Sequence, residues 1–213
     1  MINEAQKYRF PVIETQIFPN VLFFGILYHF KGICFEVCEN YQKRSFRNRY
    51  IIGTTQGKLN MSIPLQKGKN ESQAIRLVNI SYDFNWQQQQ WNAIQSAYGK
   101  SPYFIYYKDE IQDLIFQKTN SLFEFNQKII QMICSLIKLP CEFEYTTDFN
   151  PENSISFYNK INLQSNTGQA EYYQVFQKDR FIPNLSILDT LFHLGPETLL
   201  YVKSTKSLLD KLI

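Results

Sequence analysis

The apolar positions in the first part of the chain come in short blocks, and their order predicts a β-α-β unit. Phe10 to Ile17 (FPVIETQI) and Ile33 to Val37 (ICFEV) are typical of strands, because β-branched and aromatic residues dominate them. Between them, Val21 to Phe30 (VLFFGILYHF) is almost entirely apolar, as expected of a short buried helix. The chain is therefore expected to begin with a compact β-α-β unit.

The following blocks predict a hairpin and one further strand. YIIGTT and KLNMSIPL flank Gln56-Gly57, a polar pair that favours a tight turn. After the polar stretch QKGKNESQ, the block IRLVNI (Ile75 to Ile80) predicts another strand. The N-terminal part of the chain is therefore expected to be rich in sheet.

From Asn85 onward the apolar residues follow a helical spacing. Trp91, Ile94 and Tyr98 fall at i, i+3 and i+7, and Gly99 follows as a natural helix end. This spacing predicts a helix over Asn85 to Tyr98.

The clearest predicted helix is Leu122 to Leu139, where apolar residues repeat every three or four positions. Ser121 and Glu124 form a capping box before it, and Pro140 ends it. CEFEYT then predicts a strand, and the tail LSILDTLFHLGPETLLYV predicts a helix, a Gly-Pro break and a second helix.

The expected fold class is mixed α and β, with a sheet-rich N-terminal half that starts with the β-α-β unit and a helix-rich C-terminal half. The chain has 213 residues, of which 44% are hydrophobic. It fits one domain over residues 1–213, since single cores stop growing only beyond about 250–300 residues. Residues 147–170 are polar and turn-rich, which indicates a long or partly ordered loop.

Charge and hydropathy exclude several classes of protein. The net charge of +3 and the pI near 8.5 are too small for a nucleic-acid-binding domain, which typically has a pI above about 9. The longest apolar block is Val21 to Phe30, whereas a membrane-spanning helix needs about 20 residues. The first residues also lack the order of a signal peptide. We expect a cytoplasmic protein without a membrane span and without a nucleic-acid partner.

The motifs of the common enzyme classes are absent: the chain has no Gly-rich dinucleotide loop, P-loop, H-E-x-x-H or G-x-S-x-G. Its two histidines, His29 and His193, lie far apart within apolar blocks. Cys34 and Cys38 supply at most half of a zinc site, and the four cysteines show no CxxC spacing, so reduced thiols are expected. We expect neither a metal nor a cofactor.

The segment ENYQKRSFRNRYII concentrates positive charge directly before a predicted strand. Lys43, Arg44, Arg47 and Arg49 lie within seven positions. On an extended segment Arg47 and Arg49 would project from one face and Asn48 from the other, and a guanidinium group matches phosphate or carboxylate oxygens. The pattern predicts an anion site. The alternative is a solvated edge segment whose charges discourage strand pairing.

Aromatic residues crowd the stretch SAYGKSPYFIYY, which contains Tyr98, Lys100 and Tyr103. Buried Tyr hydroxyl groups need polar partners, so some of these side chains are candidates for the wall of a pocket. The alternative is a helix that packs Trp91, Ile94 and Tyr98 into the core.

A third block, QVFQKDRFIPNLSILDTLFHLGPE, precedes and includes a predicted helix. Asn184 and Ser186 are natural N-caps, and Asp189 lies in the first turn, where the helix dipole favours a carboxylate. Helix capping explains all three residues. A role of Asp189 as a catalytic base is the alternative.

These three blocks resemble the WbqC-like protein family, a bacterial family whose members often lie among genes for surface-polysaccharide synthesis. The resemblance runs from IFPNVLFFGIL through NYQKRSFRNRY, SIPLQKG and the W-x4-W helix with SAYGKSPYF to FIPNLSILDTLFHLGPE. The matching positions are Tyr41, Lys43, Arg47, Asn48, Arg49, Tyr98, Pro102, Phe104, Pro183, Asn184, Ser186 and Asp189. One departure is Gln90, where many relatives have a His that would suit a general base.

The resemblance implies a transferase that modifies sugars of a surface polysaccharide such as O-antigen, by acyl, aminoacyl or glycosyl transfer. We expect it to use an anionic activated donor, such as a nucleotide sugar or an acyl carrier. The alternative is a non-catalytic binding or assembly protein of a polysaccharide-synthesis complex. The catalytic candidates are Asp189 and Tyr98, and the ligand-binding candidates are Lys43, Arg47, Asn48, Arg49, Lys100, Tyr103 and Asn184.

Overall fold

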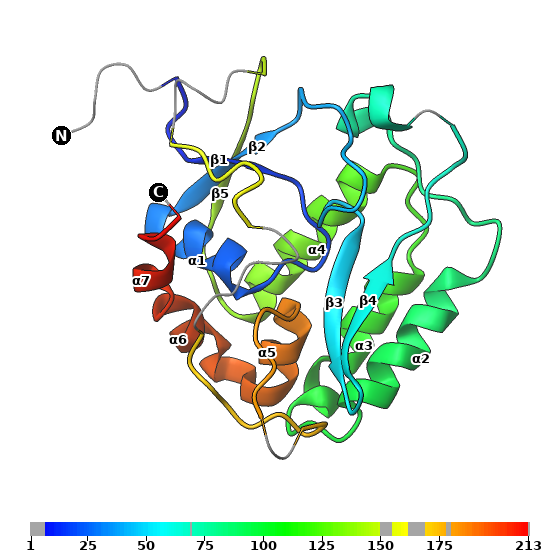
Figure 1. The fold of residues 1–213 in the computed structure, drawn as a ribbon, viewed down its shortest axis with the longest axis vertical. Coiled ribbons are helices and arrows are strands. Elements are labelled where there is room, and N and C mark those ends of the chain that lie inside the picture. The colour runs from blue at the N-terminus through cyan, green and yellow to red at the C-terminus, as the bar shows by residue number, and fades with distance from the viewer. Residues whose placement is uncertain (1–6, 69, 150–154, 162–168, 178–179, 213) are drawn as a thin grey trace.

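The structure of the chain, a computed structural model, describes residues 7–68, 70–149, 155–161, 169–177 and 180–212. Figure 1 shows a small parallel sheet at the upper left, an antiparallel hairpin near the centre, and helices packed around both. The expected mixed α and β class, with sheet near the N-terminus and helices in the C-terminal half, is confirmed.

The predicted β-α-β unit is present. Strand β1 (Val12–Glu14) leads through helix α1 (Val21–Phe30) to strand β2 (Gly32–Glu36), which pairs with β1 in parallel. The predicted strand CEFEYT is β5 (Glu142–Tyr145), and it pairs in parallel with the other edge of β2. The sheet order is therefore β1-β2-β5.

A further segment pairs with the remaining edge of β1. Ser156 forms an isolated parallel bridge with Val12. The N–H of Val12 donates to the carbonyl of Ile155, and the N–H of Phe157 donates to the carbonyl of Val12, both at 2.8 Å. Of the loop expected over 147–170, residues 150–154 and 162–168 lie outside the described part. The described residues between those two gaps thus extend the parallel sheet beyond β1.

The predicted hairpin consists of β3 (Arg49–Thr54) and β4 (Gly57–Ser62), paired in antiparallel register. The turn ends at Gly57, whose φ of 111° is a conformation that favours glycine. Tyr50, Ile51 and Ile52 in β3 are all buried, whereas β4 is mostly exposed. β3 is therefore covered on both faces, and β4 is the exposed strand of the hairpin.

The prediction of a strand over IRLVNI is wrong. Two short 3-10 helices occupy this region, η1 (Asn70–Ser72) and η2 (Ile75–Leu77). The backbone N–H groups of Ile75 and Ile80 donate to two separate loops rather than to one neighbouring strand. Ile75 and Val78 are buried three residues apart, which is the repeat of a 3-10 helix.

Three helices follow, α2 (Trp86–Tyr98), α3 (Phe104–Phe116) and α4 (Leu122–Leu136). α2 and α4 were predicted, and the side chains of Asn85 and Ser121 cap their first turns. α4 ends earlier than predicted. α3 was not predicted, because its start, FIYY, is rich in aromatic and β-branched residues that do not favour a helix.

The C-terminal region contains α5 (Ile187–Leu194), the 3-10 helix η4 (Gly195–Glu197), α6 (Thr198–Lys203) and α7 (Lys206–Leu209). This confirms the predicted helix, Gly-Pro break and helix. α1 packs against α6 and α7, and Figure 1 shows these two helices beside it at the left of the molecule.

One continuous cluster of buried apolar residues joins α1, β2, the hairpin and helices α2 to α7. All four cysteines are free thiols. Within the described residues, no helix is long and apolar enough to cross a membrane.

Replacing Gly25 in α1 tests the contact between α1 and α7. A Cβ at this position would lie 2.2 Å from Oγ1 of Thr205, which itself donates to the carbonyl of Val202. Overpacking of this kind typically costs about 1–3 kcal/mol, so Gly25→Ala should lower the free energy of unfolding by that amount in urea denaturation. Adding Thr205→Ala removes the clashing oxygen and should recover part of the loss. Strictly additive effects of the two substitutions would contradict this contact.

Candidate functional site at the carboxyl edge of the parallel sheet

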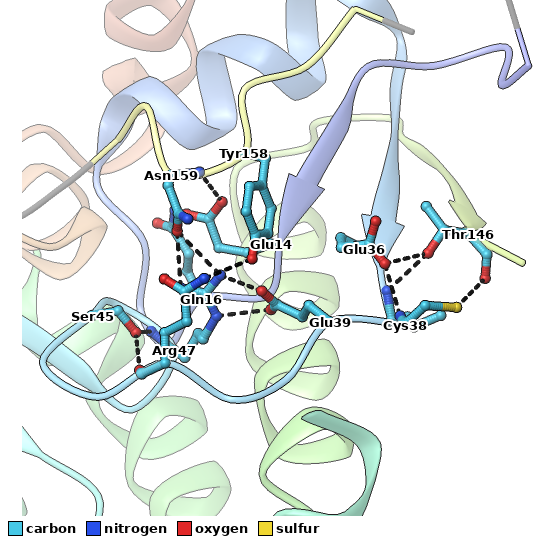
Figure 2. Close-up of polar contacts among 12 residues, drawn as sticks. Glu14, Gln16, Glu36, Cys38, Glu39, Ser45, Arg47, Thr146, Tyr158 and Asn159 are labelled. Carbon is cyan, nitrogen blue, oxygen red and sulfur yellow. Dashed lines mark hydrogen bonds and ion pairs between the residues drawn. The ribbon is translucent and has the colours of Figure 1, made fainter. Parts of the chain in front are cut away.

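Polar side chains gather where the parallel strands end (Figure 2). β1 ends at Glu14 and β2 ends at Glu36, and parallel strands place their carboxyl ends at the same edge. Tyr158 and Asn159 follow the Ser156 bridge and reach this edge from the other side of β1. We call Glu14, Gln16, Glu39, Arg47, Tyr158 and Asn159 the edge cluster.

The topology favours this edge as a ligand site. From β1 the chain crosses to β2 on one side, whereas the Ser156 segment pairs with β1 on the other side. In open α/β sheets, ligands bind beyond the carboxyl ends of the strands. The edge cluster lies at that end of the sheet.

Glu14 is the carboxylate at the centre of the edge cluster. Its side chain accepts hydrogen bonds from Nε2 of Gln16 at 2.6 Å and from the backbone N–H of Asn159 at 2.8 Å. Burial raises the pKa of Glu14, and the positive charge of Arg47 offsets only part of this effect. A buried carboxyl group with a raised pKa in such a position is a candidate for proton transfer.

Arg47 forms a buried ion pair with Glu39. Both side chains are about 1% exposed, and Nε and Nη2 of Arg47 donate to the two carboxylate oxygens, the first at 2.8 Å. Both terminal nitrogens also donate to Oδ1 of Asn159 at 3.2 Å, and the guanidinium lies 5.5 Å from the ring centre of Tyr158. Burial lowers the pKa of Arg47, but the hydrogen bond and charge of Glu39 raise it by more.

The charge balance of the edge cluster suits a ligand that donates hydrogen bonds. Two carboxyl groups, Glu14 and Glu39, stand against one guanidinium, so Arg47 is neutralised within the cluster. Oε1 of Gln16 is buried and has no hydrogen-bond partner among the described residues. Carboxylate and amide oxygens accept hydrogen bonds from hydroxyl and amino groups.

Glu36 forms a neighbouring polar group at the same edge. Its Oε1 accepts from the hydroxyl of Thr146 and from the N–H of Cys38, both at 2.8 Å, while Oε2 is buried without a partner among the described residues. Burial raises the pKa of Glu36, and the charge of Glu39 adds to this effect. Figure 2 shows this group beside the edge cluster.

The cations of the basic segment do not act as one unit. Arg47 lies in a turn, and the extended segment begins only at Arg49, so the expected alternation of side chains along one strand is not present. Nε of Arg49 is buried without a hydrogen-bond partner in the described part of the chain. Lys43 is exposed. Asn48 is buried and bonded to the hydroxyl of Tyr41, so it supports the loop.

Asn184 lies at the junction between β1 and α1. Its Oδ1 accepts a hydrogen bond from the side chain of Asn20, which caps α1 by accepting from the N–H groups of Leu22 and Phe23. Asn184 has a φ of 61°, a conformation that Asn tolerates better than most residues. The structure thus places Asn184 beside the entry to α1, close in topology to the end of β1.

The two catalytic candidates belong to a second polar network, which we call the α5 cluster: Tyr98, Ser101, Tyr172, Gln174, Asp189 and His193. Asp189 is completely buried, and its Oδ2 accepts from the Tyr172 hydroxyl and, at 2.8 Å, from Nε2 of Gln174. The Tyr98 hydroxyl accepts from the N–H of Gly53 at 3.1 Å. Burial and the negative charge of Asp189 raise the pKa of Tyr98, so its phenol stays protonated.

His193 is the member of the α5 cluster that sequence reasoning placed in an apolar helix and set aside. Its Nδ1 donates to the carbonyl of Asp189 at 2.7 Å, and its Nε2 accepts from the N–H of Val175 at 3.1 Å. Ser101 Oγ lies 3.2 Å from the same Nε2. A Ser-His-Asp order is present, but backbone groups occupy both ring nitrogens and Ser101 is buried, so the ring acts as a structural bridge. The i, i+4 spacing of Asp189 and His193 in the sequence could have indicated that the two residues lie side by side on one helix face.

Lys100 and Tyr103 lie apart from the edge cluster, in the turn between α2 and α3. Lys100 is exposed, and the Tyr103 ring packs where a Cβ on Gly195 would otherwise lie. Gln90 is buried between α2 and the hairpin, where it accepts from the Tyr50 hydroxyl and donates to the carbonyl of Ser62. Gln90 is therefore not part of either polar network.

No group of three or more His, Cys, Asp or Glu side chains within the described residues is arranged to hold a metal ion.

Replacing one partner of the buried ion pair should lower the unfolding free energy far more than replacing both partners with apolar residues. Arg47→Met leaves Glu39 as an uncompensated buried charge, which typically costs about 3–5 kcal/mol of unfolding free energy. Arg47→Met combined with Glu39→Leu should cost much less than the sum of the two single changes. Urea denaturation measures both, with Arg44→Met in the adjoining turn as a control expected within about 0.5 kcal/mol of the wild type. A mild effect of Arg47→Met alone would contradict the buried pair.

Glu36→Gln should gain stability relative to the wild type as the pH rises. The pKa of Glu36 is raised in the folded state above its ordinary value of 4.5. The protonated side chain therefore adds to the unfolding free energy fully below pH 4.5, and this stabilisation is lost as the pH rises through the pKa of the folded state. The substituted amide keeps an oxygen for the bonds from Thr146 and Cys38 but carries no charge. The difference in unfolding free energy between pH 5 and pH 8 measures this effect, about 1.4 kcal/mol for each pH unit separating the two pKa values. A difference that stays constant with pH would contradict it.

Comparison with known protein families confirms the resemblance that the three sequence blocks indicated. The WbqC-like protein family matches residues 15–174 and 157–201. These ranges include the α5 cluster and every member of the edge cluster except Glu14, which lies one position before the first range. No curated protein and no solved structure gives a significant match to the chain. The family match covers most of the chain, and the protein therefore belongs to the WbqC-like protein family.

Proposed function

We propose that this protein is a transferase that modifies a sugar of a surface polysaccharide, with the edge cluster as its active site and Glu14 as the general base. One observation carries the proposal: a buried carboxyl group with a raised pKa lies at the carboxyl edge of a parallel sheet. Membership of the WbqC-like family supports the class of substrate, through the resemblance described above.

The acceptor is a sugar hydroxyl or amino group. Such groups donate hydrogen bonds, and the edge cluster contains the buried carboxyl group of Glu14 and the buried amide oxygen of Gln16, which has no hydrogen-bond partner among the described residues. The N–H of Asn159 donates to one oxygen of Glu14. The acceptor would take over this position when the segment around Asn159 moves aside.

The donor is an activated, anionic molecule such as a nucleotide sugar or an acyl carrier. Arg47 is not assigned to it, because Glu39 already neutralises that guanidinium. Arg49 is a better candidate, since its Nε is buried without a partner among the described residues and it follows Arg47 by two positions. A planar guanidinium group binds phosphate or carboxylate oxygens through paired hydrogen bonds.

The transfer step follows from these assignments. The acceptor oxygen or nitrogen forms the new bond to the transferred group, and the bond between that group and its carrier breaks. Glu14 takes the proton from the acceptor, and the carrier leaves with the bonding electrons. A general base of this kind typically contributes a factor of about 10²–10⁴ in rate.

Glu14→Gln tests the proposal directly. Radiolabelled nucleotide sugars and acyl carriers are incubated with amino-sugar acceptors, and labelled product is measured. For the donor that gives product, Glu14→Gln should lower kcat by about 10²–10⁴-fold, while Arg49→Met should chiefly raise the KM for the donor. Arg44→Met, a cation in the adjoining turn, is the matched control and should leave both constants unchanged.

The pH dependence of the wild-type protein provides a second measurement that needs no substitution. Turnover should fall at low pH with an apparent pKa above 4.5, because a general base must be ionised and burial raises the pKa of Glu14. A Glu14→Gln protein that folds and keeps more than half of its activity would overturn the assignment of the base. Absence of product with every donor would overturn the transferase and leave a non-catalytic assembly role.

A further inference from the structure

A cavity of about 380 Å³ lies in the irregular segment before α5, apart from the edge cluster. Its wall contains the aromatic rings of Tyr172, Tyr173 and Phe181, together with the polar side chains of Glu171, Gln174 and Arg180. Small-molecule sites typically have volumes of about 300–1,000 Å³ and combine apolar rings with a few polar groups. The cavity has the size and composition of such a site.

The inner wall of the cavity is fixed by the α5 cluster. Tyr172 and Gln174 both donate to the completely buried carboxylate of Asp189, so this wall rests on a charged group inside the protein. Gln174 also accepts from the N–H of Ile182 at 2.8 Å and donates to its carbonyl at 3.1 Å. The Tyr172 ring packs edge to face on Phe181, with ring centres 4.9 Å apart. Side chains held this way form a preorganised surface.

The outer wall offers groups to a ligand. Tyr173 is 69% exposed, which is a large exposure for an aromatic ring beside a cavity. Among the described residues of the wall, Glu171 and Arg180 bring one negative and one positive charge. An anion would be attracted by Arg180 but repelled by Glu171, so this pair gives an anion no clear Coulomb advantage. A neutral molecule with an apolar face and many hydroxyl groups can use both side chains as hydrogen-bond partners.

We propose that this cavity is a carbohydrate-binding subsite. The C–H face of a sugar ring packs on Tyr173, and its hydroxyl groups, each a donor and an acceptor, bind Glu171 and Arg180. This inference rests on the proposed function for the kind of glycan that binds. It adds to that function a second binding site for the acceptor, away from the edge cluster. Asp189 serves the subsite by holding Tyr172 and Gln174.

Binding of defined trisaccharides to the full chain tests the proposal without any donor. Saturation-transfer NMR and calorimetry are carried out with chitotriose, maltotriose and UDP. At least one trisaccharide should bind, and Tyr173→Ala should weaken its affinity by tenfold or more. Tyr106→Ala is the matched control, because Tyr106 is also 69% exposed but lies on α3 outside the cavity wall, and it should leave the affinity unchanged.

Each contrary outcome overturns the subsite. Failure of both trisaccharides to bind removes it, and so does equal affinity of Tyr173→Ala and the wild type. Binding of UDP alone, lost in Tyr173→Ala, would make the cavity a nucleotide site instead. Because binding is measured without donor, a negative result here leaves transfer by Glu14 testable, and a loss of transfer in Glu14→Gln leaves sugar binding unaffected.

Discussion

The buried ion pair between Arg47 and Glu39 is the interaction on which the carboxyl edge depends. Removing a guanidinium and a carboxylate from water costs several kcal/mol for each ion, and only close geometry with further hydrogen bonds offsets it. Here Asn159 supplies those bonds, and the Tyr158 ring adds a cation–π contact. The pair therefore joins the loop after β2, the turn before β3 and the segment after Ser156. Asn126 of α4 holds the same turn by donating to the carbonyl of Arg47 at 2.8 Å.

Helix α5 connects the two polar networks. At its start, the N–H of Ser186 donates to the carbonyl of Ile51 in β3, and the N–H of Ile187 donates to the carbonyl of Pro19 before α1. One turn further, Asp189 and His193 bind the segment that carries the cavity. A single short helix thus fixes the junction near the edge cluster and the wall of the proposed subsite.

Arg47 and Arg49 show that the surroundings of a charged side chain decide whether it can bind a ligand. Both belong to the same basic segment. The Glu39 carboxylate neutralises Arg47, whereas Arg49 begins β3 and its buried Nε has no hydrogen-bond partner in the described part of the chain. Likewise, Asp189 is a carboxylate in a polar network, but it accepts from Tyr172 and Gln174 and thereby stabilises a wall. Chemistry at the edge is assigned to Glu14 because its pKa is raised by burial at the end of a strand.

The residue pattern alone was enough to predict the helices and strands that have a regular apolar spacing or clear capping and turn residues. The β-α-β start, the hairpin at Gly57, helices α2 and α4 and the Gly-Pro break were predicted because apolar spacing, caps and glycine act over a few residues. The blocks around Arg47, Tyr98 and Asp189 were also found from sequence. Helix α3 and the 3-10 helix η2 were missed because tertiary packing outweighed weak local preference.

Which of these residues come into contact depends on how the chain packs in three dimensions. Glu14 and Asn159 are far apart in the chain, and the parallel bridge at Ser156 alone brings them together. The pairing of Arg47 with Glu39 and the contact of His193 with Val175 depend equally on how loops pack. Burial, which raises the pKa of Glu14, is a property of the packed chain, and no local pattern of residues encodes it.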